Sequence, residues 1–464
     1  MTEFDVQELE RYQDVLGQMT SLKTYTHIAL GFRSTSSIAS ITTELESAAR
    51  TLVKTFPWIG GHVVRQGKGP GKTGLATIVP YLTGERPTPV IVKDITGDFP
   101  SLDAIMSAGV PMTVLDGGIL AVRRGLPDGY DEAEEPAPVL IIQANIIEGG
   151  IILVFQGNHN TMDMNGMGQI TFLYAKALRC EPFTDIEIEQ GNRDRRHVVK
   201  LLGSNDEKVD IGKYMVEPTP ANIPPAKLPP PDLRWVYFHF SGPKLAEIKA
   251  VASGPSEGDP GEGALQWVST DDALSAFICQ RVTAARMKRM EIKQQAIFCR
   301  AVNGRRFLEP PIPNEYLGHL VTCNYTTVSL DSAAATTDLP ALARQMRVNL
   351  WSIRSVQIQS LATKLNESDD KGCISYGAPL DTSGWDLLIS SFSGLDLNQT
   401  EFGDVLGGSP LFSKRPRFTP LESLMYFMPK TYERGIDVAC CLKNEDIENV
   451  RKDEHFLRYA QYVG

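Results

Sequence analysis

Hydrophobic residues recur at helical spacing between residues 44 and 56. Leu45, Ala48, Leu52 and Phe56 fall on one face of such a helix. The segment 57–61 follows at once with a proline and a pair of glycines, which end helices. The pattern therefore predicts an amphipathic helix over 44–56.

Two runs of apolar, β-branched residues come later, VLIIQANII at 139–147 and IILVFQGNH at 151–159. The segment 148–150, Glu-Gly-Gly, separates them, and such a short glycine-rich spacer is typical of a hairpin turn. The second run stops at His159. After Asp163 the apolar residues return to helical spacing, which predicts a helix that begins just beyond the hairpin.

The segment 216–232 holds seven prolines. Proline lacks a backbone donor and disrupts helices and central strands, so this segment is typical of a linker. It divides the chain into an N-terminal domain, 1–215, and a C-terminal domain, 233–464. The second domain begins with a strand-like segment at 234–240. A helix is then predicted from Ser269 onward, with Asp272 completing a capping box.

Composition narrows the function. The chain has 464 residues and a net charge of −10. Nucleic-acid binding requires a basic face, so no nucleic-acid partner is expected, although a few local cations could still bind a small anion. The seven cysteines form no C-x-x-C pair, and no two histidines have metal-ligand spacing, so neither a disulfide framework nor a metal site is predicted. The N-terminus resembles no secretory signal, and no apolar run is long enough to span a membrane, so we expect a cytosolic protein without membrane contact.

Candidate chemistry lies at the end of the second apolar run, in the sequence His159-Asn-Thr-Met-Asp163. A histidine between a buried strand and a helix is well placed for proton transfer near neutral pH. The carboxylate four residues on could pair with a base or cap the helix. Glycines at 157, 166 and 168 would let a ligand or another backbone approach closely.

The His-x-x-x-Asp pattern by itself also occurs by chance in many proteins. Histidines elsewhere in the chain suit core or surface positions better than a catalytic site: His27, His62, His197, His239 and His455. The chain lacks the G-x-S-x-G of serine hydrolases, a P-loop, and a G-x-G-x-x-G after a strand. The turn at 159–163 therefore remains the main candidate.

At His159 the sequence resembles the BAHD acyltransferase superfamily, whose hallmark is H-x-x-x-D. Further matches follow in the expected order: LESAARTLVKTFPWIGGHV, STDDALSAFICQRVTAAR, AVNGRRFLEPPIPNEYLGHLV and the Glu-Phe-Gly at 401–403. Within the superfamily, the chain is most similar to the fungal trichothecene 3-O-acetyltransferases, through the Asp163-Met164-x-Gly166 sequence, PLESLMYFMPK at 420–430 and the terminal YAQYVG.

The resemblance implies an α/β fold of two chloramphenicol-acetyltransferase-like domains that face each other across a tunnel. Part of 375–400 would pack on the first domain. Acetyl-CoA would enter as cosubstrate from one mouth and a trichothecene-like alcohol from the other, with no bound cofactor. His159 would act midway as general base. One chain would contain both halves of the tunnel, so a monomer is expected.

The resemblance also assigns roles to individual residues. Asp163 would turn away from the substrate and pair with Arg305, with Arg306 as the alternative. Ser269 and Thr270 match a stretch that lines the CoA arm, and both also suit an ordinary helix cap. The site glycine is Gly166.

Four further positions carry expectations. Ser390 and Ser391 match a small-hydroxyl element beside the catalytic centre and could bind the oxyanion or CoA. Glu401 replaces the family's aspartate in a structural element, where we expect an ion pair of altered geometry. The basic cluster 414–417, Lys-Arg-Pro-Arg, could meet CoA phosphates or be solvated surface charge.

Alternatives remain open from sequence alone. The acceptor could be another secondary-metabolite alcohol or an amine. A catalytically inactive binding module is a second alternative, against which the intact His159 and Asp163 argue. A peptide-synthetase condensation domain would carry H-H-x-x-x-D-G, and Asn158 and Met164 break that pattern.

Overall fold

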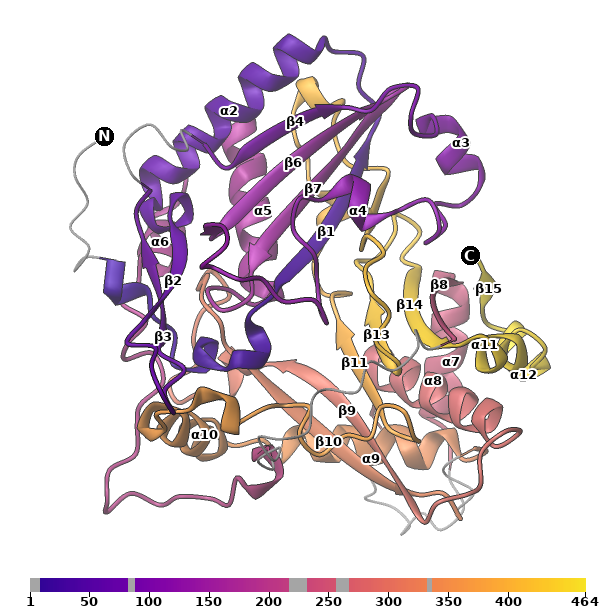
Figure 1. The fold of residues 1–464 in the computed structure, drawn as a ribbon. Helices are drawn as coiled ribbons and strands as arrows, with labels where there is room; N and C mark the ends of the chain where they lie inside the picture. Colours follow the sequence, from indigo (N-terminus) through magenta and orange to yellow (C-terminus); the bar gives the residue numbers. More distant parts are fainter. Residues whose placement is uncertain (1–8, 82–87, 217–231, 256–266, 332–335) are drawn as a thin grey trace.

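The computed structural model describes residues 9–81, 88–216, 232–255, 267–331 and 336–464. The proline-rich linker predicted at 216–232 lies almost wholly outside the described residues. Two large β-sheets and a small one organise the chain (Figure 1).

The first sheet contains the predicted hairpin. Its strands lie in the order β12 (Phe412–Lys414), β1 (Tyr25–Phe32), β7 (Gly150–Asn158), β6 (Leu140–Ile147) and β4 (Val90–Asp94). β7 pairs antiparallel with both β1 and β6. Gly149 makes the hairpin turn at φ 79°, a left-handed conformation that glycine adopts without strain. Every residue of β6 and β7 is buried, which explains why both runs are continuously apolar.

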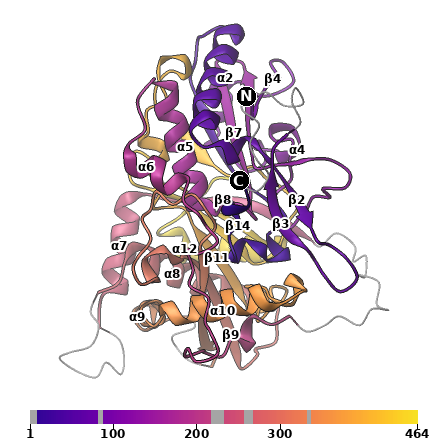
Figure 2. The same ribbon diagram turned by 90° about the vertical axis from the view of Figure 1, so that its left-hand side faces the viewer.

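Two helices, α2 (Ile38–Thr55) and α5 (Met164–Leu178), cover one face of this sheet (Figures 1 and 2). The predicted apolar face of α2 is buried, but the helix begins six residues before the predicted start at 44. The Ser37 side chain accepts a hydrogen bond from the backbone N–H of Ser40 and so caps the helix there. α5 begins directly after Asp163, as the spacing predicts.

The second sheet has seven strands. Their order is β10 (Val321–Ser329), β9 (Gln295–Asn303), β11 (Leu387–Ser391), β13 (Leu424–Phe427), β14 (Ile436–Lys443), β8 (Leu233–Phe240) and β15 (Gln461–Tyr462). α7 (Gly242–Ala252), α8 (Thr270–Arg286), α9 (Leu339–Trp351) and α11 (Asn444–Val450) lie on it. α8 starts with the predicted capping box of Ser269 and Asp272.

The remaining elements are peripheral. The small sheet has the order β3 (Leu75–Val79), β2 (His62–Gln66) and β5 (Ala137–Pro138). Further helices are α3 (Leu102–Ser107), α4 (Gly117–Leu120), α6 (Asp185–Gly191), α10 (Ser355–Glu367) and α12 (Glu454–Leu457). In the described part of the chain, no helix combines the length and apolar character needed to cross a membrane.

One strand crosses between the halves of the chain. β12 comes from the C-terminal half, yet it pairs antiparallel with β1 at the edge of the first sheet. Phe392, Leu395 and Leu397 also pack into the first hydrophobic core. The sequence places this crossing within 375–400. In the structure it extends to β12, whereas β11 at 387–391 belongs to the second sheet.

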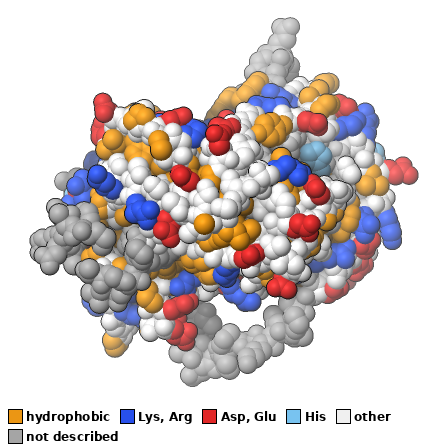
Figure 3. All heavy atoms as spheres, turned by 90° about the horizontal axis from the view of Figure 1, so that it is seen from above, with side chains coloured by type: hydrophobic (Ala, Val, Ile, Leu, Met, Phe, Trp, Pro, Cys, Tyr) orange, Lys and Arg blue, Asp and Glu red, His pale blue; other side chains and the backbone are white. Residues whose placement is uncertain are grey.

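Surface charge is mixed rather than segregated. On the face shown in Figure 3, basic and acidic side chains of the described residues are interspersed. This face therefore offers no concentrated cationic field to an extended anionic partner.

Candidate active site

His159 follows the last residue of β7, where the first sheet ends. Its backbone N–H donates to the Thr24 carbonyl at 2.9 Å, and its ring Nδ1 lies 3.0 Å from the Met162 carbonyl oxygen. A carbonyl oxygen can only accept, so Nδ1 carries the proton in this contact. The other ring nitrogen, Nε2, is left with a free lone pair. The backbone thus fixes the tautomer that a general base needs.

The charge state of His159 favours the same role. Burial lowers its pKa below the usual value of 6.5, while the Met162 contact and the nearby Asp163 carboxylate act in the opposite direction. The imidazole is therefore neutral at neutral pH and able to accept a proton.

Asp163 is bound on all sides and turned into the protein. It caps α5 by accepting from the backbone N–H of Gly166 at 2.8 Å. Arg305 donates to both carboxylate oxygens, at 2.7 and 3.1 Å, and the backbone N–H of Leu320 donates at 2.8 Å. Burial alone would raise the pKa of Asp163, but the charge and hydrogen bonds of Arg305 hold it below its usual value of 3.8. The sequence-predicted pair is present, and Arg305 rather than Arg306 forms it.

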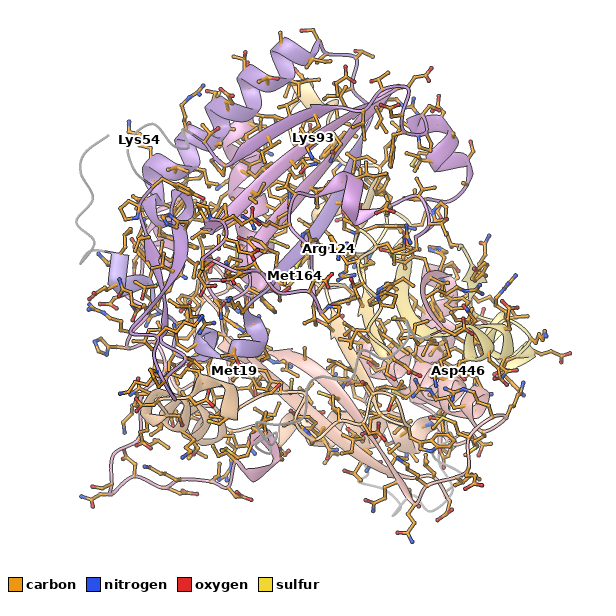
Figure 4. The ribbon with its side chains drawn as sticks, viewed as in Figure 1. Met19, Lys54, Lys93, Arg124, Met164 and Asp446 are labelled. Atoms are coloured by element: carbon orange, nitrogen blue, oxygen red, sulfur yellow. The ribbon has the colours of Figure 1, made fainter. Side chains whose placement is uncertain are left out.

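A cavity of about 310 Å³ opens beside this pair. Asp163, Met164 and Asn165 border it from the start of α5, and Ser390, Ser391 and Phe392 border it from the end of β11. Figure 4 shows Met164 between the first sheet and the strands of the second. Two predicted hydroxyls therefore meet the His-x-x-x-Asp turn across the interface of the two halves. The Ser391 and Ser393 hydroxyls also lie 2.9 Å apart.

Comparisons with known proteins agree with this geometry. The model of the "Transferase family" matches residues 126–457, and that of the "Trichothecene 3-O-acetyltransferase-like N-terminal domain" matches residues 24–178. "O-acyltransferase pigD" of Monascus ruber is 38% identical over 98% of this chain and 99% of its own length. "Trichothecene 3-O-acetyltransferase TRI101" of Fusarium sporotrichioides is 35% identical over 97% and 96%.

Solved structures give the same result. The crystal structure of F. sporotrichioides TRI101 complexed with coenzyme A and T-2 has a TM-score of 0.86 at 34% identity and covers 97% of this chain and 99% of that one. F. graminearum TRI101 complexed with coenzyme A and deoxynivalenol has a TM-score of 0.87 at 33% identity, over 97% and 99%.

This chain belongs to the transferase (BAHD) family. It is an acyl-CoA:alcohol O-acyltransferase with the two-sheet α/β fold of that family, and its cosubstrate is of the CoA type.

Gly166 was predicted to bind ligand, and the structure contradicts this. It is buried within α5, and a Cβ built on it would lie 2.2 Å from the Leu317 carbonyl oxygen. The glycine is required because the backbone at 317–318 approaches the helix closely. Of the two roles that the sequence allows for this glycine, close approach of another backbone is correct.

Ser269 and Thr270 do not line the cavity beside Asp163. Ser269 caps α8 together with Asp272, whose carboxylate also binds Arg300 of β9 at 2.8 Å. The next residues of β9, 301–303, do border the cavity. The cap therefore supports the cavity wall from behind, and a direct contact of either hydroxyl with CoA stays a prediction.

Glu401 forms no buried ion pair, which corrects the expectation for this position. Its side chain is exposed, and its carboxylate accepts from the Gly403 N–H at 3.2 Å and the Ser409 hydroxyl at 3.4 Å. Arg179 donates to the backbone carbonyl of Glu401. Solvent, rather than a buried cation, therefore balances most of its charge.

The basic cluster at 414–417 is also not what the sequence indicates. Lys414 is 3% exposed and its Nζ lies 3.3 Å from the Asp437 carboxylate. Arg415 is 4% exposed and packs over the Tyr426 ring. Arg417 is partly exposed, and it pairs with Asp116 at 2.6 Å. Neither solvated charge nor phosphate binding describes the first two residues.

Sequence reasoning missed His319. This histidine is 2% exposed, and its ring lies against that of His159 with 5.1 Å between the centroids. It sits within the stretch that ends YLGHLV, but no local pattern marks it, since the contact joins residues 160 positions apart in the sequence.

The described residues contain no group of three or more histidine, cysteine, aspartate or glutamate side chains that could hold a metal ion. All seven cysteines are free thiols.

Proposed function

We propose that the enzyme transfers acetyl from acetyl-CoA to the 3-hydroxyl of a trichothecene-type sesquiterpenoid, with His159 as general base. The observation that carries the proposal is the His159 ring itself. Its Nδ1 is bound to the Met162 carbonyl, which leaves Nε2 as a neutral acceptor at the interface of the two halves. Similarity to TRI101 complexed with coenzyme A and T-2 supports the choice of substrates.

The reaction needs no covalent enzyme intermediate. Nε2 of His159 takes the proton of the acceptor hydroxyl while the oxygen attacks the thioester carbonyl. The carbon–oxygen bond forms, and the carbonyl electron pair moves to the oxygen as an oxyanion. Collapse breaks the carbon–sulfur bond, and the protonated histidine returns its proton to the CoA thiolate. General-base catalysis of this kind contributes about 10²–10⁴-fold.

Other residues support this step without exchanging protons. The hydroxyls of Ser390 and Ser391 border the cavity and are placed to donate to the oxyanion or to the CoA arm. Asp163 and Arg305 hold the turn that carries His159 and do not contact substrate. Holding both substrates in one cavity adds the advantage of proximity.

The deciding experiment uses purified full-length enzyme, acetyl-CoA and a trichothecene with a free 3-hydroxyl. Thiol release and product mass are followed for the wild type and for His159→Ala. A mass gain of one acetyl group that is lost in the variant supports both parts of the proposal. Acetyl transfer that survives in His159→Ala would exclude this residue as the base.

A second acceptor class is favoured by one observation. The relatives with the higher identity, at 38%, are "O-acyltransferase pigD" of Monascus ruber and "O-acetyltransferase dmxR13" of Cryptosporiopsis, and neither name specifies a trichothecene. Acetyl-CoA turnover with other secondary-metabolite alcohols, but none with the trichothecene, would favour this alternative. The monomeric state and cytoplasmic location stay predictions.

A further inference from the structure

His319 is the side chain that lies directly against the proposed base. The two imidazole rings meet edge to face, with centroids 5.1 Å apart and planes inclined by 64°. His319 is 2% exposed and comes from the segment between η6 (Gly304–Phe307) and β10, whereas His159 follows β7. The contact therefore joins the two halves of the molecule at the catalytic turn.

Both ring nitrogens of His319 lack a hydrogen-bond partner among the described residues, and both are buried. An unpaired buried polar group costs about 1–3 kcal/mol relative to an apolar side chain of the same shape. A leucine would fill this position without that cost. Such an arrangement calls for a role in which polarity matters.

The ring is uncharged and its tautomer is free. Burial, followed by the neighbouring His159, lowers the pKa of His319 to about 3. The other charged groups that act on it are Asp163, Arg305 and Arg195. A neutral imidazole has one N–H and one lone pair. Because none of the described protein groups binds either nitrogen, the ring can turn a lone pair toward His159.

The backbone around His319 is fixed on both sides by one ion pair. The Gly318 carbonyl accepts from Arg305 at 2.8 Å, and the Leu320 N–H donates to Asp163 at 2.8 Å. Asp163 also caps the helix that follows His159. The same carboxylate therefore sets the positions of both histidines.

We propose that His319 is a positioning residue that stabilises the imidazolium form of His159 as it appears during acyl transfer. The inference rests on the proposed function of His159 as general base. When His159 takes the acceptor proton, a cation forms in a buried site, and the lone pair and ring face of His319 are already in place beside it. His319 itself gains and loses no proton in the step.

The test replaces His319 by leucine, which has a similar volume and no polar atom. We expect kcat to fall about 10-fold, in the range of a lost interaction with a charged group. The acid limb of the pH–rate profile should move to lower pH, because the unsupported imidazolium is less stable and His159 becomes a weaker base. KM for acetyl-CoA should change little. His319→Asn keeps a donor and an acceptor and should restore part of kcat.

Thermal unfolding separates this role from a structural one. Because leucine removes two unpaired buried polar atoms, His319→Leu should unfold at the wild-type temperature or above it. His455→Leu, at an exposed position on α12, serves as the matched control and should keep the wild-type rate.

Three results would overturn the inference. The first is a wild-type kcat and acid limb in His319→Leu. The second is a parallel loss of kcat, acetyl-CoA KM and melting temperature, which would make His319 a packing residue. The third is transfer that survives in His159→Ala, which would also remove the proposed base. If His159→Ala is inactive and His319→Leu is normal, only the present inference fails.

Discussion

Arg305 and Asp163 join the two halves of the enzyme through two parallel hydrogen bonds, at 2.7 and 3.1 Å, and each side chain is 1% exposed. The guanidinium also donates to the carbonyls of Tyr316 and Gly318. All of these groups are removed from water, so each charge depends on the other. The pair is thus a fixed point on which the catalytic turn and the 316–320 segment are both built.

Asp163→Asn should destabilise the enzyme strongly. It leaves the buried Arg305 charge uncompensated, and breaking such a pair costs about 3–5 kcal/mol. Urea unfolding followed by fluorescence measures the loss. Arg306→Ala removes the neighbouring, exposed guanidinium and provides the control, with a much smaller effect. Equal midpoints for Asp163→Asn and wild type would refute the role of the pair.

Gly166→Ala should reduce both stability and activity, although alanine is normally the better helix former by about 1 kcal/mol. The new Cβ would meet the Leu317 carbonyl at 2.2 Å and push the 316–320 segment away from α5. Gly168→Ala in the same helix is the matched control, because its Cβ meets only the end of the Leu395 side chain, which can move. If the two variants melt alike, the close backbone approach is not what requires glycine at 166.

The pH–rate profile should show an acid limb below pH 6.5. Burial lowers the pKa of His159, so the base stays unprotonated and active as the pH falls through 6.5 and loses activity only below that point. Rates of thiol release in saturating acetyl-CoA between pH 4.5 and 8 measure it. A limb centred above 6.5 would show that His159 is easier to protonate than its surroundings predict.

Stability should decline in mild acid because of buried histidines. His27 and His319 both have a pKa of about 3 in the folded enzyme, and burial is the main cause for each. In the unfolded chain both titrate near 6.5, so below that pH the unfolded state binds more protons and stability falls toward the folded pKa. Each histidine should cost about 2 kcal/mol between pH 6.5 and 5.

Urea midpoints measured at several pH values test this. His27→Leu should flatten the dependence by the contribution of one histidine, whatever its effect on the absolute stability. A slope that is the same in the variant and the wild type would contradict the assignment.

Glu401→Gln should leave the melting temperature and the cooperativity of unfolding unchanged. The carboxylate is exposed and its two contacts, at 3.2 and 3.4 Å, are long. Differential scanning calorimetry on the intact variant measures both quantities. A lower or broader transition would indicate an ion pair that the structure does not contain.

Local patterns predicted the elements that carry the catalytic turn. The β6–β7 hairpin, the start of α5 and the capping box at Ser269 all depend on residues close in sequence, and the structure has each of them. The start of α2 was placed too late because the capping Ser37 precedes the apolar repeat on which the prediction depended.

Contacts between distant segments were beyond such patterns. β12 has only three residues, and its place in the first sheet depends on pairing with β1, about 380 positions earlier in the chain. Lys414 and Arg415 look like surface charge because nothing nearby in sequence shows the strands that cover them. His319 was missed for the same reason. Arg305 was found only through family resemblance, since an arginine in a loop carries no local sign of its partner.

The pairing of β12 with β1 has a consequence for recombining this enzyme with its relatives. A chimera that joins residues 1–215 of one protein to the C-terminal half of another would exchange an edge strand of the first sheet together with the second domain. The acceptor side of β1 would then have to match a foreign strand in register and in side-chain volume. Exchange of 392–418 as a separate block, together with the N-terminal half, would keep that sheet native, and crossover points should therefore be chosen on either side of this insert rather than at the linker alone.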